Sequence, residues 1–273
     1  MPREDTAQSG DGGSTRPGER DGAGILAIVS AAADRSHDRS RSHDPRGHRL
    51  DDAAHDLSAR AWLAALAGRF LVFDGPDGSG KSTQMARFIA LCREHGLSVS
   101  DVREPGGTPI GEQIRSILLD PVNTEMTVRC EMLLYMASRA QLVIERIEPA
   151  LAQGHLVLSD RFVSSTLAYQ GTAGGLSEDE IRAVAAVAVG ARMPDLVVIF
   201  DVDEVTSAKR LSPLLDRMEQ KGLDFHRRVR AGYLAQAARD PDHHLVVDAS
   251  REPDEVFAAL LAGLAKRAAA LAG

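Results

Sequence analysis

The sequence is poor in cysteine: its 273 residues include only two, Cys92 and Cys130. Their spacing forms neither a CxxC pair nor a Cys/His cluster, so we expect no disulfide framework and no zinc site. Two free thiols in a reducing cytoplasm are the expected state. The sequence also lacks any apolar run approaching the roughly 20 residues that a membrane-spanning helix requires, so no such helix is predicted.

The chain has no excess of positive charge. Lysine and arginine together number 32 against 39 aspartate and glutamate residues, which gives a formal net charge of −7. A negative net charge provides no general attraction for nucleic acids or membrane surfaces, so neither is an expected partner. Any anion that the protein binds must therefore be held by a local cluster of basic side chains.

Residues 1–67 differ in composition from the rest of the chain. The first 56 residues are rich in Gly, Ser, Asp, Arg and His, with one apolar stretch at Ile25–Ala33. Such a segment buries too little surface to offset its ordering entropy, so we predict that residues 1–67 form a disordered, low-complexity extension. The apolar stretch begins too late for a typical signal peptide, and the many acids argue against a transit peptide. Metal binding by the His/Asp/Arg cluster and an extension upstream of the true start stay open as alternatives.

A different pattern follows, and we assign residues 68–273 to one folded domain. Asp56–Gly68 predicts a short amphipathic helix leading into it. Short β-branched runs then alternate with longer helical patterns. The patterns predict strands at 69–74, 98–102, 156–160, 195–202 and 244–250, and helices at 83–96, 110–120, 131–154 and 177–191. Continuous apolar strands separated by helices indicate a parallel sheet that is covered on both faces.

A glycine-rich stretch, FDGPDGSGKSTQ, follows the first predicted strand and opens the first helix. Its residues Gly75, Gly80, Lys81 and Ser82 match G-x-x-x-x-G-K-[ST] in the context that this motif requires. The glycines let backbone N–H groups turn inward, and the helix N-terminus adds its dipole. Lys81 would reach the terminal phosphates, and the Ser82 hydroxyl would ligate Mg²⁺. A surface turn is the alternative, but the complete motif favours binding of ATP or GTP with magnesium.

Several arginines indicate a second anion site. Arg103 and Arg161 stand at the carboxyl ends of predicted strands, where open α/β sheets bind their ligands. The planar guanidinium suits phosphate because it offers two parallel charge-assisted hydrogen bonds. Arg115 and Arg139 lie on the following helices, and each arginine taken alone could be a surface charge. Asp160, at the end of the third strand, is a candidate magnesium acid or else a turn aspartate.

Six stretches of the chain, in order, resemble thymidylate kinases: FLVFDGPDGSGKSTQ, REPGGTPIGEQIRSILLD, LLYMASRAQLV, ALAQGHLVLSDRFVSSTLAYQG, MPDLVVIFDV and LDRMEQKGLDFHRRVRAGYLAQAA. The pairing of REPGG with DRF..S..AYQG is more specific than the phosphate loop. The resemblance implies an α/β P-loop kinase, a three-layer sandwich with a five-stranded parallel sheet in order 2-3-1-4-5, helices on both faces and a short lid. It implies phosphorylation of dTMP to dTDP by ATP and Mg²⁺, a step in dTTP synthesis.

The resemblance also implies roles for individual residues. The ATP phosphates would be held by Gly75, Pro76, Asp77, Gly78, Ser79, Gly80, Lys81, Ser82 and Thr83. The metal would be held by Ser82 and Asp160. The dTMP phosphate would be held by Arg103, Arg115 and Arg161.

The remaining implied roles concern the base and sugar of dTMP. Tyr135 matches a position, usually phenylalanine, whose ring stacks on thymine, and Arg139 would hydrogen-bond the base. Thr166 and Gln170 would line the base pocket, while Tyr169 would disfavour a 2′-hydroxyl. Asp77 would approach the dTMP sugar and the water around magnesium. Taken without the resemblance, the two tyrosines would be read as core packing.

One position departs from part of the family. Some relatives carry an arginine at the position of Gly78, whereas others supply it from the lid, which here is Ala208–Gly222. The middle of this lid lacks the basic residues common in such relatives. We therefore predict Arg217 first, and Arg210 second, as the catalytic lid arginine, alongside Lys81 and Arg161.

Other functions stay open from sequence alone. A kinase for another nucleotide or deoxynucleoside would share the phosphate loop and the DR pair. A GTPase would need an N-K-x-D motif after a strand, and the chain has none. The unusual lid also leaves a catalytically impaired homologue possible. Thymidylate kinases form homodimers through helices, and the apolar stretch IRAVAAVAVGA fits such a contact or a core helix equally well.

Overall fold

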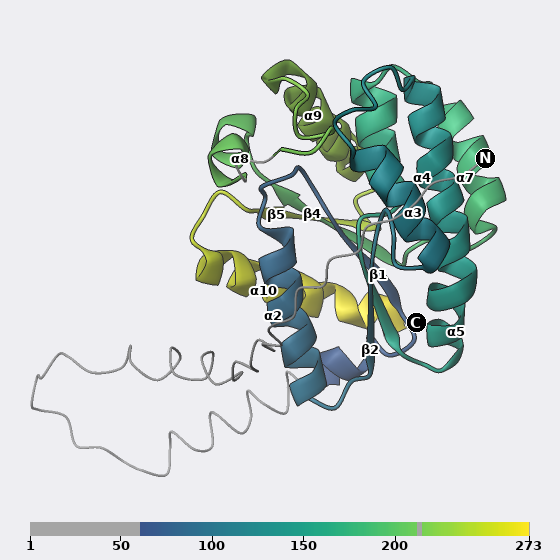
Figure 1. The fold of residues 1–273 in the computed structure, drawn as a ribbon. Coiled ribbons are helices and arrows are strands. Elements are labelled where there is room, and N and C mark those ends of the chain that lie inside the picture. Colours follow the sequence, from purple (N-terminus) through teal and green to yellow (C-terminus); the bar gives the residue numbers. More distant parts are fainter. Residues whose placement is uncertain (1–60, 212–214, 273) are drawn as a thin grey trace, which may run out of the picture. The chain divides into compact units, whose positions relative to one another are not determined.

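A computed structural model describes residues 61–211 and 215–272 of the chain (Figure 1). The predictions made for residues 1–60, including disorder and the apolar stretch Ile25–Ala33, lie outside the described residues. So do the lid residues 212–214. The two described ranges, 61–211 and 215–272, carry the fold.

These parts contain a five-stranded parallel sheet in the order β2-β3-β1-β4-β5, which confirms the predicted topology. Each strand pairs in parallel register with its neighbours; Val72 of the central strand stands opposite Ser159 on one side and Val197 on the other. The strands are β1 (Phe70–Asp74), β2 (Val99–Arg103), β3 (Leu156–Asp160), β4 (Leu196–Asp201) and β5 (His244–Asp248).

Helices cover both faces of the sheet (Figure 1). Packed on one face are α2 (Lys81–Glu94) and α10 (Pro253–Ala272). The other side carries α3 (Pro109–Leu119), α4 (Val128–Leu142), α5 (Glu148–Ala152), α7 (Glu178–Val189) and α9 (Leu223–Arg239). The predicted helix at 131–154 is α4 and α5 joined by the π-helical segment η1 (Val143–Ile147). None of the helices described combines the length and apolarity that crossing a membrane would need.

Two hydrophobic clusters separate the two faces. In β1, Phe70 and Val72 belong to the cluster under α4, α7 and α9, whereas Leu71 and Phe73 belong to the cluster under α2 and α10. All four side chains are buried, since successive residues of a strand point to opposite faces of the sheet. This double burial explains why the strand reads as a continuous apolar run rather than as an alternating one.

The packed domain begins before residue 68. Residues 61–64 are helical and 65–68 form a turn, which is the described part of the predicted helix. Leu63 and Leu66 are buried in the cluster under α2 and α10, and Trp62 stacks on Phe88. Burying a leucine side chain contributes about 1.5–3 kcal/mol, so residues 61–67, which we assigned to the extension, belong to the folded domain.

Candidate active site

The phosphate loop connects β1 to α2 and depends on glycine at two close approaches. Gly75 has φ 137°, and a Cβ there would lie 2.5 Å from the carbonyl oxygen of Phe200. Gly78 has φ 73°, and its Cβ would lie 2.5 Å from the carbonyl oxygen of Ser207 in α8 (Glu204–Arg210). Only glycine fits such backbone contacts without a shift of the neighbouring strand or helix.

Lys81, the first residue of α2, points back into this loop. Its ammonium donates hydrogen bonds to the carbonyl oxygens of Gly75 and Pro76, each at 3.3 Å. Burial and the nearby Arg161 lower the pKa of Lys81, while the surrounding aspartates oppose the change. Lys81 is therefore a desolvated cation next to a glycine-rich loop and a helix N-terminus, a combination that suits a phosphate group.

Two oxygen ligands for a metal ion lie beside the loop. The Ser82 hydroxyl is 3.5 Å from Oδ2 of Asp160, and Oδ1 of Asp160 is buried with no hydrogen-bond partner. A hydroxyl and a carboxylate are ligands that Mg²⁺ accepts, so these residues fit that ion. Within residues 61–211 and 215–272, no group of three or more His, Cys, Asp or Glu side chains could hold a metal by itself.

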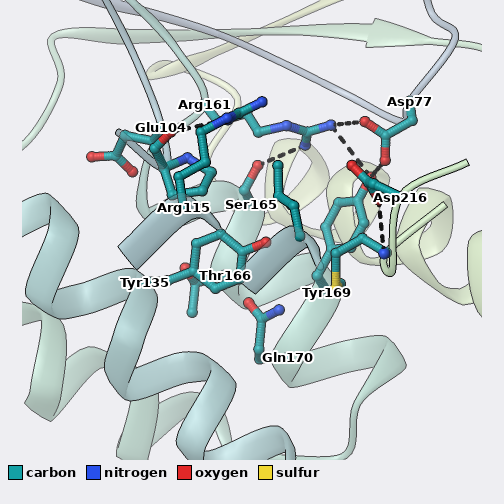
Figure 2. Close-up of a pocket in the computed structure, with 13 residues that line it drawn as sticks. Asp77, Glu104, Arg115, Tyr135, Arg161, Ser165, Thr166, Tyr169, Gln170 and Asp216 are labelled. Carbon is teal, nitrogen blue, oxygen red and sulfur yellow. Dashed lines mark hydrogen bonds and ion pairs between the residues drawn. The ribbon is translucent and has the colours of Figure 1, made fainter. Parts of the chain in front are cut away.

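A cavity beside the phosphate loop collects most of the predicted dTMP residues (Figure 2). Seven of the nine line it: Asp77, Arg115, Tyr135, Arg161, Thr166, Tyr169 and Gln170. The wall also contains residues that the sequence analysis did not single out, namely Glu104, Pro105, Leu119, Ser165, Asp216 and Met218.

Arg161 joins the cavity to the phosphate loop. It follows β3 with φ 73°, an uncommon conformation for a residue other than glycine that typically costs about 1–3 kcal/mol. Its guanidinium is ion-paired with Asp77 of the loop and donates to Ser165 at 3.0 Å and Tyr233 at 3.1 Å. Figure 2 shows the Arg161 and Asp77 side chains reaching toward each other across the top of the cavity. The guanidinium of Arg161 is thus fixed beside the loop.

Asp77 is ionised in this arrangement. Burial by itself would raise its pKa, but the positive charges of Arg161 and Lys81 outweigh that effect and lower the pKa to about 2. The hydroxyl of Tyr169 also donates to Asp77, at 2.7 Å. The negative charge of Asp77 is therefore balanced by two cations and a phenol.

A second carboxylate, Asp74, binds the hydroxyl groups that contact Arg161. This last residue of β1 is fully buried and accepts hydrogen bonds from Ser164 at 2.6 Å, Ser165 at 2.7 Å and Tyr233 at 2.6 Å. Ser165 and Tyr233 are the hydroxyls that accept from Arg161, so Asp74 orients them. The sequence analysis placed Asp74 only at the end of a strand. The local pattern that could have marked it as a functional residue is a charged side chain at the end of an apolar run.

Arg139 lies behind the cavity wall instead of in it. Its side chain is 1% exposed and donates four hydrogen bonds within the protein. The guanidinium pairs with Glu104 and donates to Thr166 at 3.1 Å, while its other partners are the sulfur of Met136 and the carbonyl oxygen of Phe162. Arg139 thus holds Glu104 and Thr166, which line the cavity. Burial raises the pKa of Glu104 to about 7, although Arg139 opposes that rise.

Arg103 also stays outside the cavity. It closes β2, but its guanidinium is about half exposed and pairs with Glu112 at 2.9 Å. Arg103 and Arg115 both donate to the carbonyl oxygen of Pro105, at 3.2 Å and 3.0 Å. The two arginines are therefore neighbours, and only Arg115 faces the cavity.

The two predicted lid arginines point away from the phosphate loop. Arg217 pairs with Glu131 of α4 at 2.6 Å and donates to the carbonyl oxygen of Leu118 in α3 at 2.7 Å. Arg210 donates to the carbonyl oxygens of Ala249 and Ser250 after β5. The structure does not bring either side chain to Lys81.

The order of the sheet, the phosphate loop between β1 and α2, and a second cavity with an arginine at the shared edge define a P-loop kinase that phosphorylates a small acceptor. A family model described as thymidylate kinase matches residues 73–260. The chain belongs to the thymidylate kinase family.

Individual relatives agree with the family model. The chain is similar to "Thymidylate kinase" of Geobacillus sp. (strain WCH70), with 45% identity over 73% of this chain and 97% of the relative. It is 48% identical to "Thymidylate kinase" of Desulforudis audaxviator over 68% of this chain and 86% of the relative. For "Thymidylate kinase" of Deinococcus radiodurans the identity is 46% over 73% and 98%.

Proposed function

We propose that this protein transfers the γ-phosphoryl group of ATP to dTMP, giving ADP and dTDP for dTTP synthesis. The observation that carries the proposal is the contact between Arg161 and Asp77, which joins a phosphate loop to a cavity lined by an aromatic ring and an amide. Membership of the thymidylate kinase family supports dTMP as the acceptor.

The donor phosphates occupy the loop of residues 75–83. Backbone N–H groups and Lys81 neutralise their charge, and Ser82 and Asp160 hold Mg²⁺, which adds further positive charge when bound. The acceptor is a phosphate oxygen that is already anionic, so the reaction needs no strong general base. Catalysis comes from in-line positioning and from charge neutralisation by Lys81 and Arg161.

The acceptor nucleotide lies in the cavity. Its phosphate meets Arg161 and Arg115, with Arg103 as the neighbour of Arg115. Its base lies on the ring of Tyr135, beside Thr166 and Gln170, and Arg139 holds Thr166 from behind. Tyr169 and Asp77 stand near the sugar. A buried set of polar groups discriminates between bases better than an apolar pocket does, because a mismatched base leaves them unpaired.

A lid arginine completes the charge around the transferred group. Arg217 and Arg210 remain the candidates, and each would have to leave the contacts described above for that role. Lid closure also excludes water and limits hydrolysis of ATP.

The test is a coupled assay of ADP release with a panel of acceptors. The protein is supplied with ATP, Mg²⁺ and either dTMP, dUMP, dCMP or dGMP, and Lys81→Met is the matched inactive control. We expect the highest kcat/KM with dTMP. If dTMP is turned over no better than the other three, the assignment is wrong; if both substrates bind without transfer, the protein is an impaired homologue.

We also propose a homodimer in a reducing cytoplasm. Leu133 of α4 and Val187 of α7 are 50% and 87% exposed on helices that contact each other, and Cys92 and Cys130 are free thiols. Covering two such apolar side chains favours association. Light scattering after size exclusion should give a dimer mass for the native chain and a monomer mass for Val187→Glu; a monomeric native chain rules the dimer out.

A further inference from the structure

We propose that Glu131 is a positioning residue that sets base specificity by fixing the amide of Gln170. The inference rests on the proposed function, because it concerns the cavity in which dTMP would bind. Glu131 itself does not line that cavity, whereas Gln170 does.

The contact between the two residues determines which end of the amide faces the cavity. Glu131 of α4 is 1% exposed and accepts a hydrogen bond from Nε2 of Gln170 at 2.7 Å. An ionised carboxylate can only accept, so the amide nitrogen must face it. The amide oxygen of Gln170 is left for the cavity. Figure 2 shows this amide directed toward the space between the rings of Tyr135 and Tyr169.

Two cations lie beside the carboxylate of Glu131. Arg217 lies 2.6 Å from its Oε2, and the ammonium of Lys221 lies 3.4 Å from the same atom. Lys221 also stands over the ring of Phe225, at 4.6 Å from the centroid. The carboxylate of Glu131 therefore faces two cations and the amide nitrogen of Gln170. This arrangement gives Arg217 a role in the base site that needs no movement toward the phosphates.

The orientation selects one pattern of hydrogen bonding on a pyrimidine. Thymine carries a donor at N3, which the amide oxygen of Gln170 can accept. Cytosine carries a lone pair at N3, which would face the same oxygen. A buried mismatch of this kind is worth about 1.4 kcal/mol or more, equivalent to a tenfold difference in kcat/KM. Reversing the amide would reverse the preference.

The variant Glu131→Gln should bring about that reversal. The oxygen of the new amide is drawn to Arg217 and Lys221, which leaves its NH₂ group facing Gln170. The Gln170 amide must then turn its oxygen away from the cavity and present its NH₂ group to the base. We expect KM for dTMP to rise about tenfold and KM for 5-methyl-dCMP, which differs from dTMP only at N3 and position 4, to fall.

Steady-state kinetics with these two acceptors tests the proposal. The matched control is Glu145→Gln, which changes an exposed glutamate that accepts from the amide of Gln141; its ratio of kcat/KM values should equal that of the wild type. Gln170→Ala supplies a double-mutant cycle, in which Glu131→Gln should have little further effect. A general loss of stability would not lower KM for 5-methyl-dCMP. A lower KM for this substrate therefore distinguishes a positioning role of Glu131 from structural damage.

Glu131→Asp covers the case in which Glu131→Gln does not fold. It keeps the charge that Arg217 and Lys221 require but withdraws the carboxylate from Gln170 by one methylene, so KM for dTMP should again rise. A folded Glu131→Asp or Glu131→Gln variant with wild-type discrimination overturns the proposal. Failure of the wild type to phosphorylate dTMP would instead contradict the proposed function.

Discussion

Replacing Asp77 by asparagine tests the charge balance of the active site. Asp77 pairs with Arg161 and accepts from Tyr169, and its side chain is 23% exposed. Asparagine keeps the shape and one acceptor oxygen but cannot ionise. The variant therefore isolates the contribution of the negative charge to folding.

The expected magnitude follows from the pKa. The pKa of Asp77 falls from 3.8 to about 2 on folding, because the cations outweigh the effect of burial. This difference corresponds to about 2 kcal/mol of stability in favour of the ionised, folded protein. The contribution is complete above pH 5, declines as the pH falls below about 4, and is about half gone at pH 3.

The assay is urea unfolding at one fixed protein concentration, at pH 7 and at pH 3. Asp77→Asn should lower the free energy of unfolding by about 2 kcal/mol at pH 7 and by about half of that at pH 3. The control is Asp101→Asn, which removes an exposed partner of Arg93 and should cost less than about 1 kcal/mol. A pH-independent difference, or one below about 0.5 kcal/mol at pH 7, would refute the charge argument.

Three further substitutions test other parts of the site. Lys81→Met should abolish transfer while leaving dTMP binding within a few-fold of the wild type by calorimetry; equal loss of both would place Lys81 in the acceptor site. Tyr233→Phe removes a hydroxyl shared by Asp74 and Arg161, so the unfolding free energy should fall by about 2 kcal/mol and KM for dTMP should rise; unchanged values contradict the support role. Gly78→Arg should lower the melting temperature without raising kcat, since its Cβ would meet the carbonyl oxygen of Ser207. An unchanged melting temperature would show that α8 moves to make room for the side chain.

The fold was predictable because its signals are local. Apolar strands, helix caps and the glycine-rich loop each occupy a few consecutive residues, and the strand order followed from the family resemblance. The segments α6 (Val163–Thr166) and η2 (Leu167–Ala173) were missed as helices. Their residues Ser, Thr, Tyr and Gly favour helix weakly, and packing against α9 holds them in place.

The site was predictable only in part because its polar contacts join distant residues. Asp74 forms hydrogen bonds with Ser165 and Tyr233, which are 91 and 159 positions away in the chain. No local sequence pattern indicates such long-range contacts. Arg139 and Arg217 were assigned to ligands from the family resemblance. The side chains around an arginine decide whether it faces a ligand or a buried glutamate, and the structure pairs these two arginines with Glu104 and Glu131.

The two hydrophobic clusters give each substrate its own support. The helical residues that line the cavity come from α3, α4, α6 and η2 on one side of the sheet, and the others come from loops. By contrast α2, which carries Lys81, packs on the other side with α10. A core substitution such as Met136→Ala would therefore disturb binding of the acceptor. A substitution such as Phe88→Ala would disturb binding of the donor. Temperature-sensitive alleles of this protein should fall into two kinetic groups, and suppressors should arise on the same side of the sheet as the defect they correct.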